Sequence, residues 1–220
     1  MKNTMRSFAA AIAFVASAGA AEAAPMTFLN DEAGFNAALG GAILTIENFD
    51  DEAGTSDLML LNLSDLTITS TAAHLEVGAA GVCNAFGLAT QCLVINDFET
   101  TPITFTFPSP VNAFAFDFND FGDDDGTRPG NLQLTIPGLV TDLVIASSDG
   151  SNADDNAQFF GFIDPDASFT QIVLENTFFE DNVAYDNFRF GTVAAVPEPS
   201  TLALFGLGLA GIAALRRRRR

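Results

Sequence analysis

Hydrophobic and polar residues alternate along most of the chain between residues 43 and 190. In residues 103–107 and again in residues 114–118, every second residue is Ile or Phe. A period of two places such residues on one face of a β-strand. We predict ten strands, separated by segments rich in Pro, Gly, Asn and Asp: residues 43–49, 66–71, 92–95, 103–107, 111–118, 132–136, 139–146, 159–163, 169–174 and 183–190.

This series of short strands predicts an all-β fold. Two packed antiparallel sheets, a β-sandwich of the jelly-roll type, accommodate such strands best. The 22 Phe residues and the absence of Trp suit a thick core between two sheets. Because no repeat or linker interrupts the strands, residues 24–195 are predicted to form one domain between the end segments 1–23 and 196–220.

One short helix is predicted at the start of this body. Asn30 is a suitable N-cap, and Asp31 and Glu32 place negative charge in the first turn. Phe35 and Leu39 share a face because they are four residues apart, and glycines at 40 and 41 end the helix.

Residues 1–23 have the pattern of a secretory signal peptide. Lys2 and Arg6 supply the positive start, residues 8–20 the apolar stretch, and residues 21–23 a small-residue cleavage site. We therefore expect an exported protein whose mature chain begins at Ala24.

The last two dozen residues have the pattern of a membrane-directed tail. Residues 201–215 carry no charge and no proline, so they predict a short helix of about 22 Å, against ~30 Å for a hydrocarbon core. The arginines that follow would hold its C-terminus inside the cell: Arg216, Arg217, Arg218, Arg219 and Arg220. An ordinary single-pass tail anchor is the alternative interpretation.

The triplet Pro197-Glu198-Pro199, the short apolar stretch and the terminal arginines together resemble the PEP-CTERM sorting signal of Gram-negative bacteria. The resemblance implies recognition by an exosortase in the inner membrane, cleavage near the triplet, and export to the cell surface or beyond it. The implied partners are the exosortase and the secretion machinery.

The body is strongly acidic once the ends are set aside. Seven of the nine basic residues but only two of the 28 acidic ones lie in the end segments, which leaves a net charge near −24. Such a surface repels nucleic acid and anionic lipid, so we expect no nucleic-acid partner. Either bound divalent cations, calcium above all, or solubility and adaptation to salt account for this composition.

Cys83 and Cys92 are the only cysteines. Since an exported chain meets an oxidising compartment, we expect a disulfide between them. A metal or redox role would need more ligands, and His74 is the sole histidine.

Asp186 stands out in the last predicted strand. Strand alternation places Asp186 on the side of Phe188 and Phe190, which should be the core, and places Tyr185 outward. A buried carboxylate needs a partner, and calcium, which takes six to eight oxygen ligands, fits a body with few cations.

Four segments, residues 35–39, 46–50, 159–162 and 185–188, carry a second resemblance. Their order is similar to that of the calcium-bound jelly rolls of carbohydrate-binding modules. Carried over by position, the resemblance implies a structural calcium ion held by Asp50, Asp186 and, less directly, Glu47. A solvated Asp50 and a hydrogen-bonded Asp186 are the alternative.

Acidic loops offer further candidate ligands. Asp123 and Asp125 lie in the densest acidic run, residues 117–126, and could wrap a calcium ion, although the spacing departs from the EF-hand pattern. A solvated turn is the alternative for these two residues and for a third acidic loop at residues 149–155.

Catalytic motifs are absent from the sequence. There is no Gly-x-Ser-x-Gly, no His-Glu-x-x-His and no phosphate-binding glycine loop. We expect a non-catalytic protein with a structural or adhesive role in an extracellular polysaccharide or biofilm matrix. A calcium-dependent glycan-binding module is the first alternative, and a hydrolase that uses two carboxylates is the second.

Overall fold

The structure is a computed structural model, and it describes residues 24–52, 54–71, 74–84, 87–88, 90–96, 102–119, 130–148, 158–177 and 183–194. The signal peptide and sorting tail predicted from the sequence lie outside these residues. Within them, neither helix is long and apolar enough to cross a membrane.

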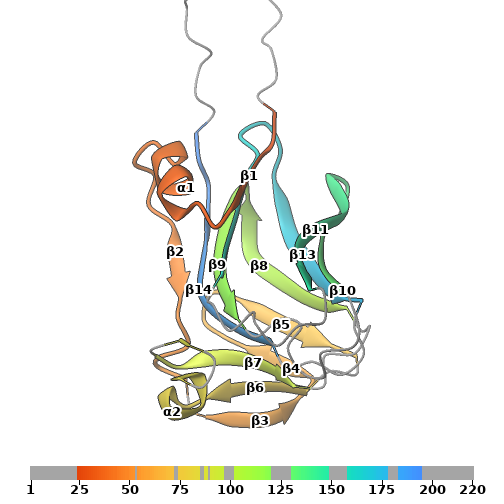
Figure 1. The fold of residues 1–220 in the computed structure, drawn as a ribbon. Coiled ribbons are helices and arrows are strands. Elements are labelled where there is room, and N and C mark those ends of the chain that lie inside the picture. The colour runs from red at the N-terminus through yellow and green to blue at the C-terminus, as the bar shows by residue number, and fades with distance from the viewer. Residues whose placement is uncertain are drawn as a thin grey trace, which may run out of the picture. The chain divides into compact units, whose positions relative to one another are not determined.

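Eight strands form the first sheet, called sheet A, and every pairing in it is antiparallel. Seven of them run in the order β1-β12-β9-β14-β7-β6-β3, and β2 also pairs with β14 (Figure 1). The strands are β1 (Met26–Leu29), β2 (Thr45–Glu47), β3 (Thr55–Leu58), β6 (His74–Gly78), β7 (Cys92–Asn96), β9 (Ala113–Asn119), β12 (Gln158–Ile163) and β14 (Val183–Gly191).

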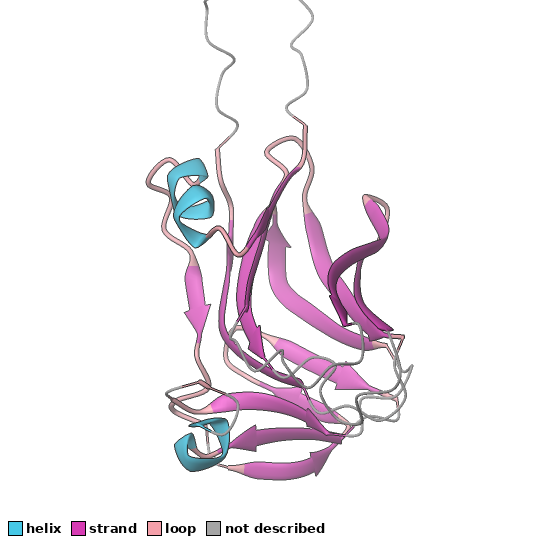
Figure 2. Ribbon diagram, in the orientation of Figure 1, coloured by secondary structure: helices cyan, strands magenta, loops and turns pink. Residues whose placement is uncertain are grey.

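Six strands form the second sheet, sheet B, in the order β11-β10-β13-β8-β5-β4, again all antiparallel. They are β4 (Leu60–Asn62), β5 (Thr67–Ser70), β8 (Ile103–Val111), β10 (Gly130–Ile136), β11 (Val140–Ser148) and β13 (Phe169–Asn176). Strands thus dominate the fold, with two short helices (Figure 2).

The inner faces of the two sheets meet in a core of phenylalanine rings. Phe105 of sheet B stacks on Phe188 of sheet A at 4.7 Å between ring centroids, and Phe188 stacks on Phe116 at 5.0 Å. All three side chains are fully buried. Offset stacking of this kind adds to the stabilisation that burial alone provides. The prediction of an all-β antiparallel sandwich is therefore confirmed.

The ten predicted strands all correspond to observed strands, but their bounds differ. The first is much shorter than predicted, since only Thr45–Glu47 pairs with β14. Residue 111 ends β8 rather than opening β9. The sequence prediction missed β1, β3, β4, β6 and the second helix, α2 (Ala80–Cys83), all of which are five residues or shorter.

Helix α1 (Glu32–Ala38) forms where it was predicted, with a different cap. Asp31 is the N-cap, and its carboxylate accepts a hydrogen bond from the Gly34 backbone nitrogen at 2.9 Å. The prediction of Asn30 as cap was wrong because Asn30 adopts a left-handed conformation (φ 51°) and accepts a hydrogen bond from the nitrogen of Phe159. Asn30 thus ties the start of the helix to β12.

Candidate functional site: a carboxylate pair beside the disulfide

A β-bulge in β14 decides which side chains face outward. Asp186 pairs with Asp117 of β9, but the next pair is Arg189 with Ala115, so β14 contains one extra residue. The bulge lies at Asn187, whose backbone adopts the left-handed conformation (φ 51°). Because of this extra residue, Tyr185 and Phe188 point to the same side of the sheet although they are three residues apart.

Two predictions about β14 were therefore wrong. Tyr185 is fully buried in the core between the sheets, not outward. Asp186 lies on the outer side of sheet A, opposite to the side of Phe188 and Phe190. Asp186 is nevertheless only 2 % exposed, because the segment that precedes β7 covers it.

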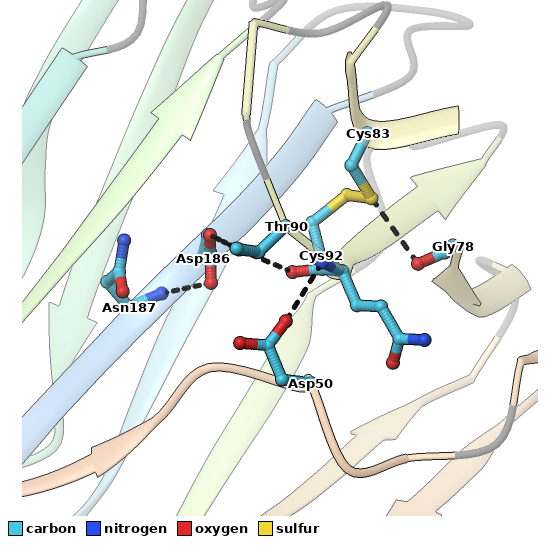
Figure 3. Close-up of a disulfide and its surroundings, with 8 residues drawn as sticks. Asp50, Gly78, Cys83, Thr90, Cys92, Asp186 and Asn187 are labelled. Atoms are coloured by element: carbon cyan, nitrogen blue, oxygen red, sulfur yellow. Dashed lines mark hydrogen bonds between the residues drawn. A yellow bond between two sulfur atoms is a disulfide. The ribbon is translucent and has the colours of Figure 1, made fainter. Parts of the chain in front are cut away.

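That covering segment is anchored by the disulfide between Cys83, at the end of α2, and Cys92, at the start of β7 (Figure 3). Both cysteines are fully buried in a small outer cluster with Val94 and Ala184. Gly78 makes room for the bridge, since a Cβ there would lie 3.1 Å from the sulfur of Cys83. The predicted disulfide is confirmed.

Thr90 and Gln91, next to the disulfide, bind one carboxylate each. The Thr90 hydroxyl donates to Asp186 Oδ2 at 2.9 Å, and the Gln91 backbone nitrogen donates to Asp50 Oδ1 at 3.2 Å (Figure 3). Asp50 and Asp186, 136 residues apart in the chain, are thereby brought to the same two-residue segment. We call Asp50 and Asp186 the carboxylate pair.

The remaining oxygens of the carboxylate pair also accept hydrogen bonds. The Asn187 nitrogen donates to Asp186 Oδ1 at 2.6 Å, and the Asn48 amide donates to Asp50 Oδ2 at 2.9 Å. Oriented to satisfy its hydrogen bonds, the Gln91 side-chain nitrogen donates to the carbonyl oxygens of Phe49 and Glu52. Neutral donors thus hold both carboxylates and link the turn after β2 to the segment that precedes β7.

Burial governs the electrostatics of Asp186. Desolvation raises its pKa from 3.8 to about 6, and the nearby Asp117 and Asp50 add to that effect. The hydrogen bonds from Asn187 and Thr90 oppose the rise without cancelling it. An ionised Asp186 therefore costs the folded state free energy at neutral pH.

Asp117 and Arg189 border the pair on the outer side of sheet A. Burial raises the pKa of Asp117, while a hydrogen bond from the Asn187 amide, at 2.9 Å, and the charge of Arg189 lower it. Arg189 lies 3.9 Å from Asp117 and forms an ion pair with Glu32 of α1. The guanidinium thus connects helix α1 to the border of the carboxylate pair.

Glu47 does not join the carboxylate pair. It lies opposite Phe188 in the register, so it is on the core-facing side of β2, and it is buried. Its carboxylate accepts a hydrogen bond from the Phe49 nitrogen at 2.8 Å, and burial raises its pKa, with further contributions from Asp51, Glu52 and Asp65.

Calcium binding stays a prediction. Two carboxylates supply at most four of the six to eight oxygens that calcium takes. Across the described ranges, no group of three or more His, Cys, Asp or Glu side chains is placed to hold a metal. The residues present fit a calcium ion only in part. Asp123, Asp125 and the acidic loop at 149–155 lie outside the described residues.

Three residues of this site were missed by sequence reasoning: Thr90, Gln91 and Asp117. A signal existed for Asp117, because it alternates with Phe116 and Phe118 and so had to face away from the core. Thr90 and Gln91 gave no such signal, since nothing in the sequence indicates what the disulfide loop covers.

Comparison with known proteins identifies one sequence motif. Residues 195–219 match the PEP-CTERM protein-sorting motif, so the chain carries that motif at its C-terminal end. No curated protein matches the chain.

Among solved structures, the chain is similar to carbohydrate-binding modules. A mutant of the module CBM29-2 in complex with mannohexaose shares 12% identity, covers 64% of this chain and 94% of its own, and has a TM-score of 0.38. The tandem CBM22 domain of Paenibacillus barcinonensis Xyn10C shares 18% identity, with a TM-score of 0.43 over 72% of this chain and 47% of its own. The similarity is one of fold. The chain is thus an all-β sandwich protein that carries a PEP-CTERM sorting motif.

Proposed function

We propose that this chain is an exported protein, processed by an exosortase, with a non-catalytic structural or adhesive role in the extracellular polysaccharide layer of a Gram-negative bacterium. The match of residues 195–219 to the sorting motif is the observation that carries the proposal. Pro197, Glu198 and Pro199 would mark the cleavage region. The arginines at 216–220 would hold the C-terminus at the cytoplasmic face while the tail is read.

The domain organisation follows from this proposal. Residues 1–23 would be removed as a signal peptide, residues 24–195 would be the exported body, and residues 196–220 would anchor it transiently in the inner membrane. The partners are the exosortase and the secretion machinery, and after them the extracellular polysaccharide. The final location is the cell surface or the extracellular matrix.

The state of the carboxylate pair supports a non-catalytic role. Each oxygen of Asp50 and Asp186 accepts a hydrogen bond from a neutral donor of the protein. Satisfied hydrogen bonds are typical of a structural carboxylate. A hydrolase needs two carboxyl groups that reach the substrate, and Asp186 is buried. A hydrolase would lose activity in Asp186→Asn, which provides the test of that alternative.

Deletion of residues 216–220 tests the sorting proposal. We expect the deleted protein to keep its full remaining length and to accumulate in the membrane fraction, as seen by cell fractionation and mass spectrometry. A variant with lysines at all five positions is the matched control, because it retains the positive charge. Unchanged processing and localisation of the deleted protein would contradict the proposal.

A calcium-dependent glycan-binding module is the second candidate. The observation that favours it is the meeting of Asp50 and Asp186 at the segment of Thr90 and Gln91. Calcium would neutralise the two carboxylates, with water supplying further ligands. The test is co-sedimentation with the polysaccharide of the producing cell, in calcium and in chelator. Binding that chelator does not change would reject this candidate.

A further inference from the structure

Five threonines lie in two rows across the outer face of sheet B. Thr67 of β5 pairs with Thr106 of β8, and Thr106 pairs with Gln171 of β13. In the next row, Thr69 pairs with Thr104. The row continues through Val173 to Thr135 of β10. We call the following residues the threonine face: Thr67, Thr69, Thr104, Thr106, Thr135 and Gln171.

The residues next to the threonines along each strand show that the threonine face points away from the core. Ile68, Phe105, Ile172 and Leu134 are buried in the core between the sheets. Because successive side chains of a strand point to opposite faces, the threonines and Gln171 point outward. Thr106 is exposed, and the others are half-buried.

Most polar side chains of the threonine face make no hydrogen bond within the described part of the protein. Within the described part of the chain, the side chains of Thr69, Thr104, Thr106 and Gln171 make no hydrogen bond to the protein. Thr67 reaches the Asn62 side chain at 3.5 Å, which is at the limit of a hydrogen bond. Hydroxyl and amide groups both donate and accept, so this face can pair with hydroxyl groups of either orientation.

The two outer faces of the sandwich differ in charge. The two threonine rows contain no charged residue. Charged residues border the two rows: Asp65 lies two residues before Thr67, Glu175 is opposite Gln133 in the register, and Asp142 is bonded to Thr135 at the sheet edge. The outer side of sheet A, in contrast, carries Asp117, Asp186 and Arg189, with Asp50 beside them in the turn after β2. On an acidic body, the threonine face is therefore a surface of low charge.

A pocket of about 250 Å³ adjoins this face and shares Gln171 with it. Its other lining residues are Pro110, Pro137, Ser168, Phe169 and Thr170, so apolar proline rings and small hydroxyls line it together. The volume lies just below the usual range of ligand pockets, which suits one small unit of a larger ligand. The pocket and the threonine face thus meet at Gln171, and neither has a charged residue among its members.

We infer that the threonine face and this pocket bind a neutral polyhydroxyl polymer, an uncharged polysaccharide. Hydroxyl and amide side chains match sugar hydroxyls, whereas an anionic polymer would be repelled by the acidic body and a cationic one would prefer sheet A. No Trp is present, Tyr185 is buried, and the threonine face contains no aromatic side chain, so recognition on that face proceeds by hydrogen bonds. This inference rests on the proposed function and names the contact surface within it.

Binding of the processed protein, recovered from producing cells, to an insoluble neutral glucan tests this inference. We expect co-sedimentation that is unchanged between low and high salt, because uncharged groups are not screened, and unchanged in chelator. Thr104→Ala, Thr106→Ala and Gln171→Ala combined should weaken binding about tenfold, since each lost hydrogen bond contributes modestly. Thr45→Ala, an exposed strand threonine of sheet A, is the matched control and should bind like the unmodified protein.

Two results would overturn the inference while leaving the proposed function intact. One is normal binding by the triple variant with an unchanged melting temperature. The other is binding only to an acidic polymer such as alginate, or binding that salt abolishes. A different result would contradict the proposed function itself: the protein would be neither processed nor found with any polysaccharide of its own cell.

Discussion

Asp186 of β14 lies directly opposite Asp117 of β9, and both carboxylates face the outer side of sheet A beside the disulfide. Two acidic side chains opposite each other in a sheet repel when both are ionised. Asn187 separates them by bonding Asp186 through its backbone nitrogen and Asp117 through its amide. Burial raises the pKa of both carboxyl groups, and for Asp186 the charge of Asp117 adds to the rise.

We predict that Asp186 makes the protein less stable as the pH rises. Its pKa in the folded state, about 6, is above the ordinary value of 3.8, so between these values the folded state holds a proton that the unfolded state has lost. The contribution of Asp186 to the free energy of unfolding therefore falls from about pH 4 to above pH 6, by at most about 3 kcal/mol.

Asp186→Asn measures this effect. The amide keeps only one acceptor oxygen, so it can accept from the Asn187 nitrogen or from the Thr90 hydroxyl but not from both, and the variant should lose about 1 kcal/mol at pH 4. At pH 7.5 it should equal or exceed the unmodified protein, because the buried charge is gone. Urea unfolding at both pH values, in chelator, gives the comparison, and Asp51→Asn in the exposed turn nearby is the control. A stability difference that is constant with pH would refute the prediction.

The sequence predicted the sheets better than it predicted the site. The predicted strands with strong alternation, such as residues 103–107 and 111–118, correspond to β8 and β9 because their apolar residues must reach one core. Strands such as β3 and β4 escaped prediction because each is only three or four residues long. Their pairing is decided by neighbouring strands rather than by their own pattern.

The errors at the site have one physical cause. Strict alternation places Asp186 with Phe188 and Phe190, but the bulge at Asn187 adds a residue and reverses the faces. The alternation of apolar and polar residues cannot reveal a bulge, because Asn can adopt either the extended or the left-handed backbone conformation within a strand. The meeting of Asp50 with Asp186 was nonetheless expected from the second resemblance, and the structure brings both to the segment of Thr90 and Gln91.

The disulfide should stabilise the fold and hold the cover over Asp186. Replacing Cys83 and Cys92 by Ser removes a link that closes a short loop, and we expect a loss of about 2–3 kcal/mol. Because Thr90 lies two residues before Cys92 and donates to Asp186, the loop should also open there. Amide hydrogen exchange should increase at residues 90–92, and the NMR-measured pKa of Asp186 should change. Unaltered exchange at those residues would reject the coupling.

Gly161 should be intolerant of any side chain. A Cβ at this position of β12 would lie 2.6 Å from Cδ2 of Phe35, by which α1 packs on sheet A. Gly161→Ala should therefore cost about 1–3 kcal/mol through displacement of Phe35. Gly54→Ala is the control, since its nearest contact would be an ordinary 3.6 Å. In a Phe35→Ala background the cost of Gly161→Ala should shrink, and a cost that stays the same would show that the contact is not its cause.

The bulge at Asn187 should depend on a residue that tolerates a left-handed backbone, and Tyr185 reports on it. The chain has one Tyr and no Trp, so intrinsic fluorescence comes from Tyr185, two residues before the bulge and buried in the core. Asn187→Gly retains the conformation at φ 51° and loses only the hydrogen bond to Asp117.

Asn187→Val should cost about 1–2 kcal/mol more than Asn187→Gly and should alter the Tyr185 emission as the register adjusts. Asp142→Val strains another left-handed position (φ 50°), at the edge of sheet B, and should lower stability without changing that emission. Equal stability and emission for the Gly and Val variants would mean that the bulge does not require this backbone conformation.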